Sequence, residues 1–172
     1  MLEKQMELAL NKQVNAELWS SYLYLSMSYD MDNKGYEGMA HWFTLQAHEE
    51  FAHATRFMNF IAGMDGKVLL MPIDAVQQEW NAPLDAFENT LKHEKVVTES
   101  IHKLMDMALE LKDYRTQSML KFFIDEQIEE EDTVRKILDK FKRIGNSMEG
   151  LYLLDKELGA RVVSAQNSDT AN

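Results

Sequence analysis

Glutamates interrupt apolar stripes at four places along the chain. Each takes the place of an apolar residue in a run spaced three and four residues apart, as on one face of a helix: Glu17, Glu50, Glu94 and Glu130. The second of them opens a Glu-x-x-His sequence that ends at His53. This spacing projects a carboxylate and an imidazole side by side from one helical turn. Residue types and spacing therefore predict a buried site of carboxylates with one histidine.

Four buried carboxylates need a source of positive charge. A single glutamate in such a stripe more often lies at its edge, with the carboxylate in water. All four lie near the middles of their helices, however, and an antiparallel bundle would bring them to one level. Buried, unpaired and mutually repelling ions are strongly unfavourable. No stripe carries Lys or Arg at that level, so a metal ion is the expected partner.

Composition narrows the kind of metal. The chain has 172 residues and no cysteine, which excludes disulfides, thiolate zinc sites, iron–sulfur clusters and thiol nucleophiles. Oxygen-rich ligation with one imidazole suits iron or manganese, and two carboxylate clusters sharing one glutamate favour two ions. The net charge of −11 argues against a nucleic-acid partner. The other histidines are predicted to lie at the surface or in interfaces: His41, His48, His93 and His102.

The elements that position these residues are predicted to be helices. With only 7 Gly and 2 Pro, the chain lacks the turns of an all-β sandwich. Gly35 ends the first helix, Asn81 caps the third with Pro83 in its first turn, and Asp113 caps the fourth. Apolar periodicity predicts helices over about 6–31, 36–62, 84–111 and 114–143, with a short fifth helix over 148–158.

The connections predict the topology. Short turns make the first and second helices antiparallel, and likewise the third and fourth. Residues from about 65 to 81 can span the length of a helix, so the second and third helices can run parallel. The expected fold is an all-α four-helix bundle with one long crossover, occupying residues 1–160, followed by a polar tail over 161–172. No apolar run suggests a membrane partner, and we expect a cytoplasmic protein.

The sequence resembles the bacterial non-haem ferritins over nearly its whole length, up to about Gly159. The resemblance rests on four blocks in order, each on a separate helix: Glu17 with Tyr24, Glu49 to His53, Glu94, and Glu126 to Glu130. A lone Glu-x-x-His is a weak signal, but this ordered set followed by a short fifth helix is highly specific. The resemblance implies a ferritin-like bundle with a ferroxidase centre in each chain.

The resemblance also implies the ligand set. Glu17, Glu50 and His53 look like ligands of a first iron. Glu50, as a bridge, with Glu94 and Glu130 looks like the ligand set of a second iron.

Further residues match the family around that centre. Gln127 looks like a hydrogen-bonding residue near the site, and Tyr24 matches a tyrosine beside the two irons. Tyr24 could equally be a buried ring whose hydroxyl bonds a ligand carboxylate. A third iron site would use Glu49, Glu126 and Glu129 together with Glu130, although these residues could equally form a solvated acidic face.

Two departures from related families affect the prediction. Diiron enzymes with a permanent cofactor usually repeat Glu-x-x-His on the fourth helix, whereas here that place reads from Gln127 to Glu130 with no imidazole. We hypothesise a looser second position that passes Fe(III) onward. Haem-binding bacterioferritins are expected to have Met between the Glu and His of the second helix, where this chain has Phe51 and Ala52; we therefore expect no haem.

The implied function is iron storage. The resemblance implies oxidation of Fe(II) by O₂ and ferric mineral deposition inside a hollow shell of 24 chains, with the fifth helix at a symmetry axis. Three alternative interpretations of the sequence are a rubrerythrin-like diiron peroxidase, a metal-free structural bundle, and a DNA-protecting mini-ferritin. The missing cysteines, the missing second Glu-x-x-His and the absence of a basic tail weigh against the first and third.

Overall fold

The computed structural model describes residues 2–162, and all regular structure in that range is helical. The helices are α1 (Lys4–Asn33), α2 (Glu37–Gly63), α3 (Pro83–Glu110), α4 (Tyr114–Ile144) and α5 (Met148–Gly159). Each predicted bound lies within two residues of the observed one, and the predicted all-α bundle with a short fifth helix is confirmed. Most of the predicted polar tail lies outside the described residues. Along residues 2–162, none of the helices is both long and apolar enough to cross a bilayer.

Of the two side-chain caps that the sequence predicts, one is confirmed and one is wrong. Asp113 caps α4 as predicted, accepting hydrogen bonds from the Thr116 backbone N–H (3.2 Å) and hydroxyl (2.6 Å). The prediction that Asn81 caps α3 is wrong. The N-cap is Ala82, which has an extended backbone and no side-chain cap, and Pro83 follows in the first turn. Because proline has no N–H, one of the donors that a cap would satisfy is already missing.

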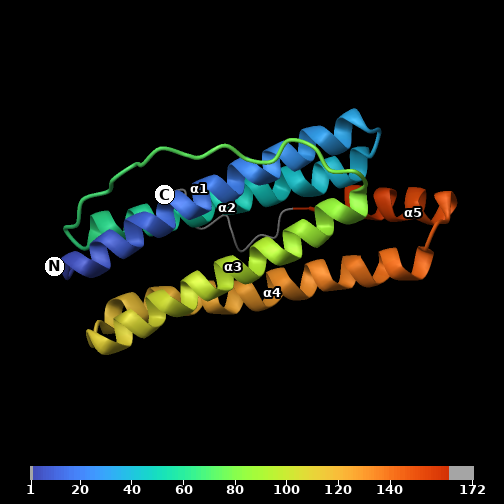
Figure 1. Ribbon diagram of the computed structural model, residues 1–172. Helices are drawn as coiled ribbons and strands as arrows, with labels where there is room; N and C mark the ends of the chain where they lie inside the picture. The colour runs from blue at the N-terminus through green and yellow to red at the C-terminus, as the bar shows by residue number, and fades with distance from the viewer. Residues whose placement is uncertain (1, 163–172) are drawn as a thin grey trace.

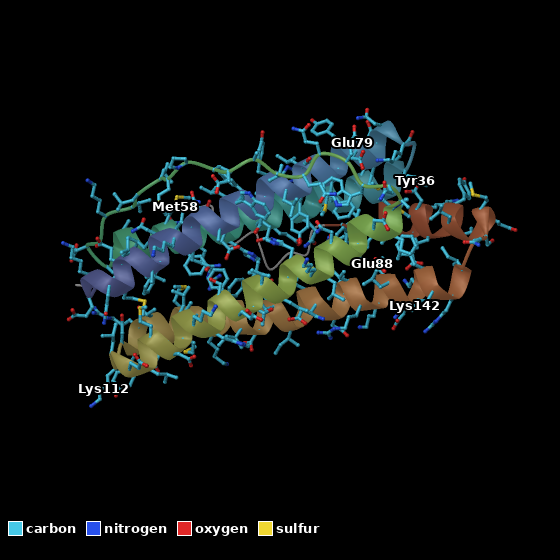
Figure 2. All side chains as sticks on the ribbon, viewed as in Figure 1. Tyr36, Met58, Glu79, Glu88, Lys112 and Lys142 are labelled. Carbon is cyan, nitrogen blue, oxygen red and sulfur yellow. The ribbon has the colours of Figure 1, made fainter. Side chains whose placement is uncertain are left out.

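The long crossover sets the helix directions. Residues 64–82 run back along the length of the bundle, so α2 and α3 are parallel while α1/α2 and α3/α4 are antiparallel pairs (Figure 1). Tyr36, at the α1–α2 turn, and Lys112, at the α3–α4 turn, accordingly lie at opposite ends of the molecule (Figure 2). This is the topology that the connection lengths predict.

Buried polar residues of α1 hold the crossover in place. The Asn11 amide, which is fully buried, donates to the Lys67 carbonyl (3.0 Å) and accepts from the Leu69 N–H (2.6 Å). Further along, Asp30 accepts from the backbone N–H of Trp80 (3.1 Å). The crossover therefore satisfies its backbone groups on α1 although it has no regular structure of its own.

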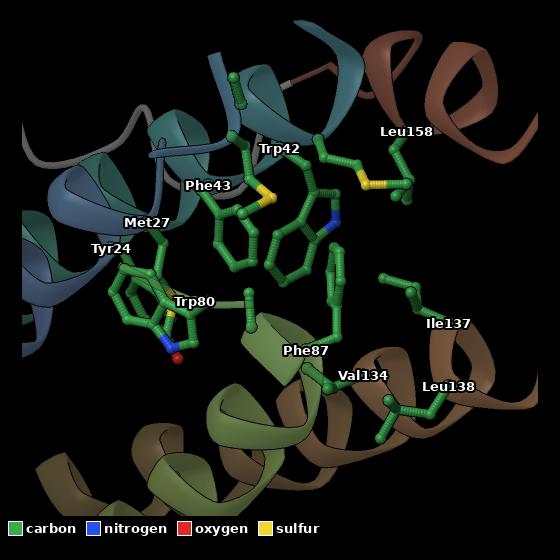
Figure 3. Packing of buried hydrophobic residues seen from close by; sticks show 14 of the residues in the cluster. Tyr24, Met27, Trp42, Phe43, Trp80, Phe87, Val134, Ile137, Leu138 and Leu158 are labelled. Carbon is green, nitrogen blue, oxygen red and sulfur yellow. The ribbon is translucent and has the colours of Figure 1, made fainter. Parts of the chain in front are cut away.

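The apolar core has two halves separated by a polar layer. Figure 3 shows one half, where aromatic rings such as Trp42, Phe43 and Phe87 pack against α4 and α5. The other half lies toward the opposite end of the bundle and includes Phe57 and Phe123, whose rings stack at 4.1 Å. Each long helix passes from one half to the other near its middle, between Val14 and Leu23, Ala47 and Phe57, Phe87 and Val97, and Phe123 and Val134. The candidate ligands lie in these four intervals.

The fifth helix packs against the start of α2 through glycine. A Cβ atom on Gly38 would lie 1.8 Å from the backbone oxygen of Asp155, and one on Gly159 would lie 3.0 Å from the Gly38 Cα. The Asp155 carboxylate also accepts from the Met39 N–H (2.9 Å). The two helices can approach this closely only without side chains at the contact.

Replacing Gly38 with alanine tests this contact. The added methyl group collides with backbone, so we expect α5 to shift and the free energy of unfolding to fall by about 1–3 kcal/mol. Gly63→Ala, at the other end of α2, is the matched control because a Cβ there meets nothing within 4 Å. Thermal unfolding followed by circular dichroism measures both. Equal midpoints for the two variants would show that α5 does not depend on this approach.

Candidate metal centre

The four stripe glutamates meet in the polar layer between the two halves of the core. Each long helix contributes one carboxylate from near its middle, and all four side chains are almost fully enclosed: Glu17 (1% exposed), Glu50 (2%), Glu94 (0%) and Glu130 (8%). The predicted burial of these residues is confirmed. Such a layer concentrates negative charge where water cannot screen it.

One candidate metal position is already assembled. Glu17, Glu50 and His53 each offer a ligand atom, and these atoms all lie within 4.8 Å of one another. The Nδ1 atom of His53 lies 3.3 Å from a carboxylate oxygen of Glu50. Among residues 2–162 this is the only set of three acidic or histidine side chains at that spacing. Glu94 and Glu130 do not complete a second such set with Glu50.

Two buried atoms of this position have no hydrogen-bond partner among the described residues: Glu17 Oε2 and His53 Nε2. A carboxylate oxygen of Glu126 lies 3.9 Å from that nitrogen, too far for a hydrogen bond. Buried polar atoms are almost always paired, and an unpaired one calls for an explanation such as an ion. The donor set of carboxylate oxygens and one imidazole fits iron or manganese.

Neutral donors orient two of the carboxylates. The side-chain amide of Gln13 donates to Glu17 (2.9 Å), and that of Gln46 donates to Glu130 (2.9 Å). An amide fixes the direction of a carboxylate without cancelling its charge. The charge therefore stays available to a cation.

Glu94 is held by two further neutral donors. The Tyr24 hydroxyl donates to one of its carboxylate oxygens, and the Gln127 amide donates to the other (3.1 Å). Tyr24 is fully buried. The structure thus places both predicted residues next to the centre, each in contact with Glu94.

The electrostatics show how strongly the layer resists carrying its full charge. Burial is the main cause that raises the pKa of Glu17 and of Glu50 well above the ordinary value. Repulsion by Glu50 adds to the first, and repulsion by Glu94 and Glu130 adds to the second. Glu50 therefore interacts with the carboxylates on both sides of it. Burial, followed by repulsion from Glu94, raises the pKa of Glu130 to about 8.

The residues predicted for a third site lie beside the centre and are less enclosed. Glu49 and Glu126 are half-buried and Glu129 is exposed. Burial, with repulsion by Glu129 and Glu49, raises the pKa of Glu126 against the lowering effect of His53. Glu49 forms an ion pair with Arg161 (2.6 Å). The structure therefore gathers these residues, with a cation of the protein among them.

One histidine differs from the expectation. His41, His48 and His102 are exposed as predicted, but His93 is only partly exposed and hydrogen-bonds to Ser20 (2.8 Å). Its ring packs against Trp19 and Tyr24, with centroids 5.4 and 5.9 Å away. Burial lowers its pKa. Its position follows from the packing of α3 against α1, which places His93 beside Ser20 and Tyr24.

Sequence reasoning missed three residues that contact the candidate ligands. Gln13 and Gln46 each lie four positions before a ligand glutamate on the same helix, so polar residues at that spacing within an apolar stripe could have revealed them. Arg161 carries no such signal. It lies far from Glu49 in sequence and reaches it only because α5 folds back along α2.

Comparison with known proteins agrees with this geometry. A family model described as a ferritin-like domain matches residues 7–144. A bacterial non-heme ferritin of Bacteroides fragilis is 40% identical over 161 residues, covering 94% of this chain and 100% of the relative. One from Staphylococcus epidermidis is 36% identical over 166 residues, 96% of this chain and 100% of the relative. An open-pore ferritin of the archaeon Archaeoglobus fulgidus superposes with a TM-score of 0.93 at 40% identity, covering 94% of this chain and 100% of its own.

The raised pKa of Glu130 predicts a pH-dependent stability of the metal-free protein. Because the folded state binds this proton more tightly than the unfolded state, the stability is greatest below the ordinary pKa of 4.5 and is lost as the pH rises through about 8. Glu130→Gln removes the titration. Relative to the parent, the variant should gain several degrees in melting temperature between about pH 5.5 and 8.5, at roughly 2–4 °C per kcal/mol.

Thermal unfolding in the presence of a chelator measures this difference. Glu129→Gln is the control, since it removes a carboxylate from the next residue, which is exposed. A difference between Glu130→Gln and the parent that does not change with pH would contradict the argument.

Proposed function

This chain belongs to the ferritin-like domain family, and on that premise we propose that it is an iron-storage protein with ferroxidase activity. It takes up Fe(II), oxidises it at two metal positions within each chain and deposits ferric mineral inside a hollow shell. The observation that carries the proposal is the cluster of Glu17, Glu50 and His53. Two of its buried atoms have no hydrogen-bond partner among residues 2–162.

The proposed roles follow the layout of the polar layer. Glu17, Glu50 and His53 hold the first iron. Glu50 bridges to the second iron, which Glu94 and Glu130 complete. The repulsion of Glu50 by both Glu94 and Glu130 supports its place between the two positions.

Other residues support these ligands. Gln127 and Tyr24 donate hydrogen bonds to Glu94 and keep it oriented. A third, outer iron position would use Glu49, Glu126 and Glu129 with Glu130.

The chemistry follows from the ligand types. Two Fe(II) ions bind, O₂ accepts one electron from each and takes up two protons to leave as hydrogen peroxide, and the Fe(III) products hydrolyse and pass to the mineral store. Carboxylate oxygens favour the harder Fe(III) state, and a shared carboxylate keeps the two ions close enough to react together. Because several of these carboxyl groups have raised pKa values, binding of Fe(II) must displace protons from them.

Assembly into a shell of 24 chains is part of the proposal, with the protein acting in the cytoplasm. The fifth helix supports assembly because it exposes large apolar side chains, Met148 (76%), Tyr152 (66%) and Leu153 (57%). Contiguous exposed apolar surface of this kind marks an interface. Because the chain carries a net negative charge, a shell cavity lined with negative charge would concentrate Fe(II).

Iron loading tests the function. Metal-free protein is loaded aerobically with excess Fe(II) and passed through gel filtration, and the iron retained per chain is measured. We expect far more than about two ions per chain, on a particle much larger than 20.0 kDa. Retention of about two would indicate a diiron redox enzyme, and none would leave a metal-free structural bundle.

Glu94→Gln tests the centre itself. It removes a buried charge from the second position, so the initial rate of Fe(II) oxidation should fall at least about tenfold, as for loss of one group that stabilises the reacting charge. Glu99→Gln, an exposed residue five positions further along α3, is the matched control and should keep the parent rate. Equal rates for the two variants would rule out Glu94 as a ligand.

The hypothesis that the second position holds iron only loosely, because it has no imidazole, gives a separate prediction. The double variant Gln127→Glu/Glu130→His supplies a Glu-x-x-His sequence on α4 and should retain more iron at the centre after loading with two Fe(II) per chain and removal of loose iron by a chelator. Ile128→Glu is the control, because it adds a carboxylate to the exposed side of the same helical turn. Unchanged retention in the double variant would count against the idea.

A further inference from the structure

Arg161 follows α5 and is fixed along one side of α2 by four contacts. Its guanidinium carbon lies 5.0 Å from the Trp42 ring centroid, and its backbone oxygen lies 3.0 Å from the Nε2 atom of His41. Its Nη1 donates to Gln46 (2.5 Å) and its Nη2 donates to Glu49 (2.6 Å). A planar guanidinium that stacks on a ring and bonds at two nitrogens has one preferred orientation. Arg161 is therefore a fixed cation rather than a solvated surface charge.

Gln46 connects this cation to the candidate centre. Its side chain is fully buried, its amide oxygen accepts from Arg161, and its amide nitrogen donates to Glu130 (2.9 Å). An amide oxygen can only accept and an amide nitrogen can only donate. By occupying the oxygen, Arg161 determines that the nitrogen faces Glu130. The orientation of Glu130 thus depends on a residue from the far end of the chain.

The positive charge of Arg161 is paired with the Glu49 carboxylate. Their ion pair is only partly exposed, with 24% of the Arg161 side chain and 13% of the Glu49 side chain accessible. A charge-assisted bond of this kind, screened little by water, is stronger than a surface pair. A metal ion approaching the Glu49 carboxylate must displace the guanidinium.

We propose that Arg161 is a positioning residue that orients Glu130 through Gln46 and, by neutralising Glu49, weakens cation binding at the third, outer position relative to the two positions around Glu50. The inference rests on the proposed function, since it concerns where metal enters the same layer. The fifth helix is then part of the centre, because it brings Arg161 to α2.

Zinc binding by the whole, metal-free assembly tests the proposal, because Zn²⁺ does not change oxidation state and the readout is binding rather than turnover. Isothermal titration calorimetry compares the parent with Arg161→Gln, Arg161→Lys and Lys156→Gln. Lys156 is an exposed cation on α5 and controls for the loss of one positive charge.

The expected result separates the two roles of Arg161. Arg161→Gln should bind one more Zn²⁺ per chain than the parent, because Glu49 becomes available. The second position, which Glu130 completes, should lose about tenfold in Zn²⁺ affinity. This is roughly the effect of removing one hydrogen-bond partner of a metal ligand. Arg161→Lys keeps a positive charge beside Glu49 but cannot also bond to Gln46. This variant should therefore bind no extra Zn²⁺, while its second position should be weakened as in Arg161→Gln. Lys156→Gln should match the parent.

Three outcomes would overturn the inference. Arg161→Gln with the parent's stoichiometry and affinities would show that Arg161 does not act on the centre. Identical changes in Arg161→Gln and Lys156→Gln would show a general charge effect. In both cases a parent that binds about two Zn²⁺ per chain leaves the proposed function standing, whereas a parent that binds none removes the proposed function and this inference together.

Discussion

Four carboxylates buried in one layer cannot all remain ionised without a cation, and the rest of the structure depends on this constraint. The apolar halves of the core on either side hold the four helices in register, so that Glu17, Glu50, Glu94 and Glu130 are almost fully enclosed. In the absence of metal, this burial raises the pKa values of Glu17, Glu50 and Glu130. Under the proposed function, a bound cation would offset the unfavourable free energy of burying these carboxylates.

The hydrogen-bond partners within the layer preserve that affinity. Glu17, Glu94 and Glu130 accept from amides or a phenol, which set their directions and leave their charge in place. A lysine or arginine in the same positions would have satisfied the carboxylates permanently and competed with metal. Uncharged hydrogen-bond donors to the carboxylates therefore distinguish a layer that can bind metal from a network of buried ion pairs.

The fifth helix connects the periphery to this layer. Gly38 lets α5 lie against α2, and the end of α5 then brings Arg161 beside Glu49 and Gln46. The same helix exposes Tyr152 and Leu153. In the proposed shell, α5 would contact neighbouring chains and also hold Arg161 beside the polar layer.

The sequence by itself determined the helices, the crossover topology and the level at which four glutamates and His53 interrupt the apolar stripes, because helical periodicity and capping act within a few residues. Only the tertiary structure decided which side chains meet across helices. Packing turned His93 toward Tyr24 and Ser20, and brought Arg161 to Glu49 across most of the chain. Residue spacing within one helix cannot predict such contacts, because they depend on how separate helices pack against one another.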